Sequence, residues 1–173
     1  MRKNPKAFGS ILDNRDEYRV QIIYSKIDRD AHNVPRFTDH YFNVDADKYF
    51  YPASTVKMPV ALLALQRLNE LKVKGLGPAS TMLTGAAYSG QQEVLNDPTS
   101  SNGTPSVGQY IRKIFLVSDN DAYNRLYEFL GMEYINEQLH KKGYPKVQIR
   151  HRLERALNED ENRHTNPVTF LDL

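Results

Sequence analysis

The stretch from Ser54 to Leu71 constrains the fold more than any other part of the sequence. Its apolar residues recur at helical spacing, and small or leucine side chains fill the other sides of its first half: Val56, Val60, Ala61, Leu62, Leu63, Ala64, Leu65, Leu68 and Leu71. A helix that is apolar on every side belongs inside a core. The spacing therefore predicts a central helix that is buried all round in its N-terminal half and ends before Gly75 and Gly77.

Two strands are predicted ahead of this helix. Tyr18–Ile27 alternates apolar and polar side chains, which is typical of a strand, and Phe37–Val44 follows after a segment rich in turn-forming residues. The second strand is expected to run antiparallel to the first, and Pro5–Leu12 can form a short helix before them. Because two strands alone are marginally stable in water, this pair needs further strands or a helix layer.

The remainder of the chain is predicted to be mainly helical. Residues 77–103 are rich in Gly, Ser, Thr and Asn, which indicates a long surface loop with one short helix. Thr104 and Pro105 are a favourable helix start, since a capping side chain precedes a proline in the first turn. Three helices are then expected, which end at the Ser118–Asn120 break, at Gly131 and at Gly143, before an irregular charged segment up to Pro167.

Composition and charge exclude several classes of function. The 173 residues contain 23 Lys plus Arg and 21 Asp plus Glu, and this net charge of +2 gives no argument for nucleic acid or an anionic membrane as partner. Cysteine is absent, which excludes disulfides, thiol nucleophiles and thiolate metal sites. The histidines lack the one-turn spacing of a helical zinc site, and no glycine-rich phosphate loop or Gly-x-Ser-x-Gly turn occurs. We expect no metal and no cofactor.

Ser54 and Lys57 form the first candidate catalytic pair. A serine at a helix start lies near the positive end of the helix dipole, which favours a developing negative charge. Lys57 lies one turn further on the same face, so its amine can reach the Ser54 hydroxyl. Burial disfavours the charged ammonium, and a neutral lysine can act as general base on the serine. The alternative is a helix-capping serine beside an exposed lysine, because Ser-x-x-Lys alone is a common string.

Ser118-Asp119-Asn120 is the second candidate, in the break between two predicted helices. All three residue types cap helices well, so a purely structural cap is the alternative. The tripeptide is rarer than Ser-x-x-Lys, and it follows that motif across a helical segment. The order of the two motifs is more specific than either motif alone.

Together these motifs resemble those of the penicillin-recognising serine hydrolases, and among them the class A β-lactamase group. The resemblance extends from about Tyr18 to the chain end and includes Arg152–Asn158, which is similar to the family's omega loop. It implies an α+β chain with a β-lactamase/transpeptidase-like fold, here an N-terminal antiparallel strand pair and a mainly helical body, with the remaining sheet strands absent.

The resemblance also implies roles for the matching residues. Ser54 would be the acylated nucleophile and Lys57 the base, or part of the proton path, for acylation. Ser118 would relay a proton to the leaving lactam nitrogen, and Asn120 would bind the amide of the substrate's side chain. Asp119 is expected to order the turn by bonding the backbone.

In the omega-like loop, Glu154 together with Asn158 would activate the water that releases the acyl-enzyme. Asn124, one turn after Asn120, is expected to bond the backbone of that loop. The alternative for Glu154 is a solvated ion pair, since the surrounding stretch contains three arginines: Arg150, Arg152 and Arg155.

The family's third signature, a Lys-Thr-Gly triplet on a sheet strand, is missing. Lys141-Lys142-Gly143 is the nearest string, but it closes a helix and lacks a hydroxyl residue. We expect residues 1–173 to be a single, incomplete β-lactamase-like domain that is not a competent enzyme by itself. Its parts are the strand pair at 17–44 and the helical part at 53–173, with an omega-like loop at about 145–167.

Three functions remain open from the sequence. The first is a β-lactamase, and the second is a penicillin-binding D-Ala-D-Ala peptidase or other serine hydrolase of the same fold with a long-lived acyl-enzyme. The third is a non-catalytic relative that binds cell-wall peptide or a protein. The family implies a β-lactam or cell-wall peptide substrate and a periplasmic or secreted location, although Met1–Asn14 lacks the apolar core of a signal peptide.

Overall fold

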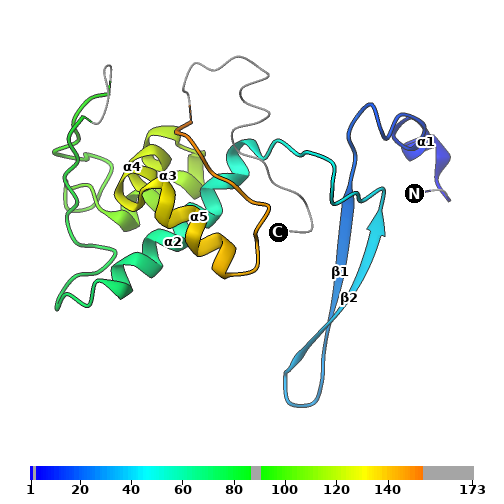
Figure 1. The fold of residues 1–173 in the computed structure, drawn as a ribbon, viewed down its shortest axis with the longest axis horizontal. Helices are drawn as coiled ribbons and strands as arrows, with labels where there is room; N and C mark the ends of the chain where they lie inside the picture. Colours follow the sequence, from blue (N-terminus) through cyan, green and yellow to red (C-terminus); the bar gives the residue numbers. More distant parts are fainter. Residues whose placement is uncertain (2, 87–90, 154–173) are drawn as a thin grey trace. The chain divides into compact units, whose positions relative to one another are not determined.

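The computed structural model describes residues 1, 3–86 and 91–153. The chain forms two compact units, and the boundary between them in the sequence falls between Tyr49 and Phe50. The elements are α1 (Pro5–Asp13), β1 (Ile22–Arg29), β2 (Pro35–Phe42), the 3₁₀ helix η1 (Ala53–Val56), α2 (Lys57–Glu70), α3 (Val107–Val117), α4 (Asn120–Leu130) and α5 (Met132–Lys141). Figure 1 labels the α-helices and strands. Within the described residues this is an antiparallel strand pair with five α-helices, so the α+β prediction is confirmed. None of these helices is both long enough and apolar enough to cross a membrane.

In the N-terminal unit, β1 and β2 form a long antiparallel hairpin, with Ile22 opposite Phe42 and Arg29 opposite Pro35. The first strand begins four residues later than the alternation predicts. The amide of Tyr18 donates to the Asn14 carbonyl at 2.9 Å, and residue 19 has a positive φ of 53°, so residues 14–20 form turns. Local turn bonds therefore replace strand pairing where the side-chain pattern alone indicates a strand.

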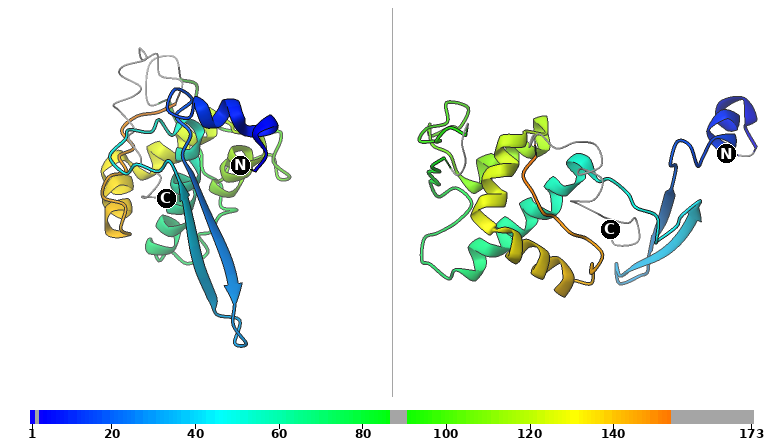
Figure 2. Two further views of the ribbon diagram at one scale, coloured as in Figure 1. Left: turned by 90° about the vertical axis from the view of Figure 1, so that its right-hand side faces the viewer. Right: turned by 45° about the horizontal axis from the view of Figure 1, so that its top comes forward.

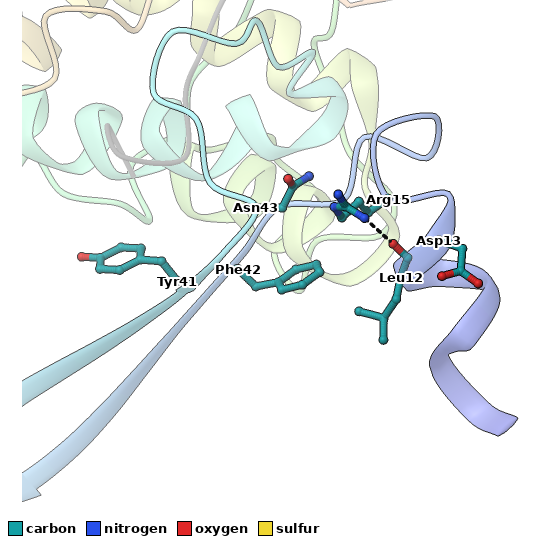
Figure 3. A pocket seen from close by; sticks show the side chains of 6 residues that line it. All are labelled: Leu12, Asp13, Arg15, Tyr41, Phe42 and Asn43. Atoms are coloured by element: carbon teal, nitrogen blue, oxygen red, sulfur yellow. Dashed lines mark hydrogen bonds between the residues drawn. The ribbon is translucent and has the colours of Figure 1, made fainter. Parts of the chain in front are cut away.

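Both faces of the hairpin expose large apolar side chains: Ile22 lies on one face, and Ile27 with its cross-strand partner Phe37 on the other. A cavity of about 490 Å³ lies in the same unit, lined by Leu12, Asp13, Arg15, Tyr41, Phe42 and Asn43. Figure 3 shows these side chains and the hydrogen bond at 2.9 Å from Arg15 Nη1 to the Leu12 carbonyl oxygen. This cavity uses none of the candidate catalytic residues.

The core of the larger unit surrounds α2, which contacts α3, α4 and α5 (Figures 1 and 2). Val60, Ala61 and Ala64 are almost completely buried, as the apolar pattern predicts. Met58 and Leu62, however, are 57% and 54% exposed, so the prediction of burial on every side is wrong. These two residues lie one turn apart on a single line of the helix, which the described residues leave uncovered.

The long loop before α3 contains no helix in its described parts, 77–86 and 91–103, where a short one was expected. Isolated β-bridges join Thr81 to Ser106 and Thr84 to Val94 instead. Helix α3 starts two residues later than Thr104-Pro105 predicts, because the Ser106 hydroxyl accepts the hydrogen bond from the Gln109 amide and caps the helix.

Asp97 ties this loop to α3 through a buried carboxylate. Lys113 Nζ lies 2.7 Å from its Oδ2, and the Thr99 hydroxyl donates to its Oδ1 at 2.6 Å. Burial by itself raises the pKa of Asp97, but the hydrogen bonds from Lys113 and Thr99 outweigh burial and lower the pKa below its ordinary value of 3.8.

This shift predicts an acid-sensitive contribution to stability. A carboxyl whose pKa is lower in the folded state stabilises the fold fully above the unfolded value and loses that contribution as pH falls through the folded pKa. The free energy of unfolding in urea should therefore fall between about pH 5 and pH 2 by more in the unmodified protein than in the Asp97→Asn variant. Equal pH dependence in the two proteins would contradict this account.

Candidate active site

Ser54 lies in η1, and Lys57 is the first residue of α2. The sequence predicted an α-helix from Ser54 onward, whereas the first turn is a 3₁₀ helix. In a 3₁₀ helix residues three apart are aligned, so this turn brings the two side chains together. Ser54 is exposed, while Lys57 is only 3% exposed. A solvent-accessible hydroxyl therefore lies beside a buried amine.

Ser118 ends α3, and Asp119 caps the start of α4. Ser118 has the left-handed backbone conformation, with φ of 54°, which is rare for a residue other than glycine and is typical of functional turns. The Asp119 carboxylate accepts a hydrogen bond from the Ala122 amide at 2.8 Å, which confirms its predicted structural role. Ala53, next to Ser54, also has a positive φ, of 45°.

The two motifs meet at three polar atoms. Lys57 Nζ lies 3.2 Å from Ser54 Oγ and 2.9 Å from Ser118 Oγ, and the Ser118 hydroxyl donates to Ser54 Oγ at 3.2 Å. Each pair is within hydrogen-bonding distance, so a proton can pass between any two of them. The structure thus brings Ser54, Lys57 and Ser118 together, although 64 residues separate the two serines in the chain.

Lys57 Nζ also donates to the Ser118 carbonyl oxygen and to Asn120 Oδ1. An ammonium has three hydrogens, so it can donate to three of these four oxygens at once. A neutral amine has a lone pair as well, which can accept the hydrogen of either serine hydroxyl. The geometry therefore suits an amine that exchanges a proton with Ser54 or Ser118.

Asn124 connects α4 to the extended segment of residues 144–153, which we call the strap. Its side chain donates to the Leu153 carbonyl oxygen at 3.1 Å and accepts from the Leu153 amide at 2.8 Å. These bonds confirm the expectation that Asn124 bonds the backbone of the omega-like segment. Glu154, the next residue in the sequence, and Asn158 lie outside the described residues, so their predicted roles stay predictions.

A second asparagine, which the sequence reasoning missed, holds the strap in the same way. Asn136 on α5 donates to the Ile149 carbonyl oxygen at 2.9 Å and accepts from the Ile149 amide at 2.8 Å. Between the segments that Asn124 and Asn136 bond, the Tyr123 hydroxyl donates to the His151 carbonyl oxygen at 3.3 Å. Burial raises the pKa of Tyr123, so the hydroxyl keeps the proton that it donates. A polar Asn136 next to the apolar Ile135 in a predicted helix gives no sequence signal for such a contact.

The strap has no regular secondary structure, yet its alternate residues Val147, Ile149 and His151 are buried. Side chains of α4 and α5 take the place of a neighbouring strand as hydrogen-bond partners. The irregular segment expected after Tyr144 is therefore held in place up to Leu153. Within the described chain, no three potential metal ligands gather at this or any other place.

Comparison with known proteins places this geometry in a fold class. The structure of a β-lactamase from Chitinophaga pinensis DSM 2588 matches with a TM-score of 0.63 and 16% identity over 95% of this chain and 58% of that one. An ancestral class A β-lactamase matches with a TM-score of 0.57 and 17% identity over 92% of this chain and 58% of that one. A β-lactamase from Desulfarculus baarsii DSM 2075 matches with a TM-score of 0.56 and 18% identity over 96% of this chain and 59% of that one. At these identities the likeness shows the fold, which is that of the β-lactamases.

Residues 15–172 match the Beta-lactamase enzyme family, and the chain belongs to that family. The predicted family and fold are therefore confirmed. The chain spans 58–59% of the length of the three solved structures named above. A search of curated proteins gave no match.

Proposed function

We propose that this chain supplies the acylation site of a serine hydrolase that opens β-lactam rings through an acyl-enzyme on Ser54. The single observation that supports this most is the mutual contact of Ser54 Oγ, Lys57 Nζ and Ser118 Oγ, at 3.2, 2.9 and 3.2 Å. An exposed hydroxyl beside a buried amine is the arrangement that general-base activation of a serine needs.

In the proposed reaction, Ser54 Oγ bonds to the lactam carbonyl carbon while its proton moves to Lys57 Nζ. The carbon–nitrogen bond of the ring then breaks, and Ser118 Oγ delivers a proton to the leaving nitrogen as it takes one from Lys57. Asn120, whose side chain contacts Lys57, is positioned to bond the amide of a substrate side chain. The product of this half-reaction is an ester on Ser54.

Release of the ester requires water. We propose that Glu154, with Asn158, removes a proton from that water while it attacks the ester carbonyl carbon. Support comes from the hydrogen bonds of Asn124 and Asn136 to the strap, because they fix its backbone up to Leu153, the residue before Glu154.

We also propose that the strand pair and the helical part belong to one domain, and the family match across both supports this. A periplasmic or secreted location is proposed on the same ground.

The fate of the acyl-enzyme tests this function. Full-length protein is mixed with benzylpenicillin, and its intact mass and the free ring-opened acid are followed with time. The proposal predicts an adduct that appears and decays while hydrolysed penicillin accumulates over many turnovers. An adduct that persists without turnover would favour a peptidase-like relative, and no adduct at all would favour a binding protein.

A further inference from the structure

Glu128 on α4 contacts two segments that are far apart in the sequence. Its carboxylate accepts hydrogen bonds from Gln91 Nε2, at 3.0 Å to Oε1 and 3.2 Å to Oε2. It also pairs with Arg152 Nε, in the strap. One carboxylate thus bonds both the loop around residue 91 and the residue two positions before Glu154 (the strap is the orange trace in Figure 1).

The contact is largely shielded from water. Gln91 is 9% exposed, and the side chains of Glu128 and Arg152 are 15% and 34% exposed. Hydrogen bonds to a charged carboxylate are stronger than neutral ones, and shielding reduces their screening by salt. An ion pair of this kind fixes geometry better than a pair on an open surface.

Two neighbours of Glu128 on α4 each bond only one of the two segments among the described contacts. Arg125, 2% exposed, donates to the carbonyl oxygens of Gly85 and Gln92 in the loop. Asn124 bonds Leu153 in the strap. Glu128 differs because one of its oxygens, Oε1, accepts from both Gln91 and Arg152, so a displacement of one segment changes the partner geometry of the other.

We infer that Glu128 is a positioning residue that couples the 91–94 loop to the strap, and that this coupling supports the deacylation step through Glu154, the residue that follows the strap in the sequence. The inference rests on the proposed function, since Glu154 acts in deacylation only if the acyl-enzyme forms. Loss of Glu128 should leave the acylation cluster intact, because Ser54, Lys57 and Ser118 are held by η1, α2 and the Ser118 turn. It should impair hydrolysis of the ester.

The test uses four full-length variants and two measurements. Glu128→Ala removes both contacts, Arg152→Ala removes the contact between Glu128 and the strap, and Gln91→Ala removes the contact between Glu128 and the loop. Glu137→Ala is the matched control, because Glu137 forms an exposed ion pair with Lys141 on α5. Amide hydrogen exchange is measured in peptides covering 91–94 and 147–153, and acylation and deacylation rates are measured with benzylpenicillin.

We expect Glu128→Ala to increase exchange in both segments. Because Glu128 couples them, Arg152→Ala should increase exchange in the strap and, to a smaller extent, in the 91–94 loop, and Gln91→Ala should do the reverse. Deacylation in Glu128→Ala should slow by roughly tenfold or more, with acylation changed by less than about threefold, since small displacements of a reacting group are costly. Glu137→Ala should match the unmodified protein in every measurement.

Exchange confined to one segment in Glu128→Ala, or effects of Arg152→Ala and Gln91→Ala that stay confined to the segment carrying the substitution, would overturn the coupling. Slower acylation with unchanged deacylation would overturn the role in positioning Glu154, and a change spread over the whole helical unit would mean that Glu128 only stabilises the fold. If the unmodified protein forms no adduct, the proposed function fails and the deacylation role fails with it, while the exchange pattern still decides whether Glu128 couples the two segments.

Discussion

Replacing Ser54 with alanine is expected to abolish the penicillin adduct in the full-length protein. Ser54 Oγ is the exposed hydroxyl that contacts both Lys57 Nζ and Ser118 Oγ, so its removal leaves the cluster without a nucleophile. Turnover of a chromogenic cephalosporin should fall by roughly 10⁴- to 10⁶-fold, as in hydrolases that lose their serine. Intact mass spectrometry with peptide mapping measures the adduct, and absorbance measures turnover.

Ser101→Ala is the control for this experiment. Ser101 is also an exposed serine, but it lies in the loop before α3 and takes part in none of the described contacts among Ser54, Lys57 and Ser118. This variant should form the adduct at the rate of the unmodified protein. An adduct of unchanged mass and rate in Ser54→Ala would place the nucleophile elsewhere and remove the basis of the proposed mechanism.

Replacing Lys57 with methionine is expected to slow acylation of Ser54 by about 10²- to 10⁴-fold, the usual contribution of a general base. Methionine has a similar length and can fill the buried space, so the core around α2 should remain packed. The loss therefore reports the missing amine. Acylation is measured by quenched-flow mass spectrometry, and thermal unfolding checks that the variant is folded.

Lys141→Met is the matched control, because it removes a lysine from an exposed ion pair on α5. Its acylation rate should equal that of the unmodified protein. A folded Lys57→Met variant that acylates within about threefold of the normal rate would show that Lys57 holds the turn together without moving a proton.

The local parts of the site could be predicted from the sequence. Ser54 and Lys57 are three residues apart, so any helical turn places them together, and the 3₁₀ geometry of η1 changed the helix type without changing that contact. The break at Ser118–Asn120 was equally predictable, because its side chains favour caps over helix interiors. That Asp119 bonds the turn backbone and Asn124 the strap was also anticipated from residue type and position.

Other features depend on contacts that no local pattern contains. The exposure of Met58 and Leu62 reflects which neighbours cover α2, whereas periodicity reports only that the residues are apolar. The start of β1 was misplaced because turn bonds at residues 14–20 compete with strand pairing. The roles of Glu128 and Asn136 arise from bonds to segments that are distant in the sequence or irregular in backbone, so a polar residue in either helix gave no warning.

The central claim is that an amine at position 57 activates the hydroxyl of Ser54, and chemical rescue tests it most directly. None of the 173 residues is cysteine, so within this chain Lys57→Cys introduces a single thiol. The thiol is alkylated in denaturant with 2-bromoethylamine, which rebuilds a lysine-length amine, or with 1-bromopropane, which gives a neutral chain of equal length. After refolding, acylation of Ser54 by benzylpenicillin is measured for each form.

We predict that the aminoethylated protein recovers acylation at Ser54, while the propylated and unmodified forms of Lys57→Cys remain slow. Equal acylation rates in the aminoethylated and propylated proteins, with both correctly refolded, would contradict the claim that the amine activates Ser54.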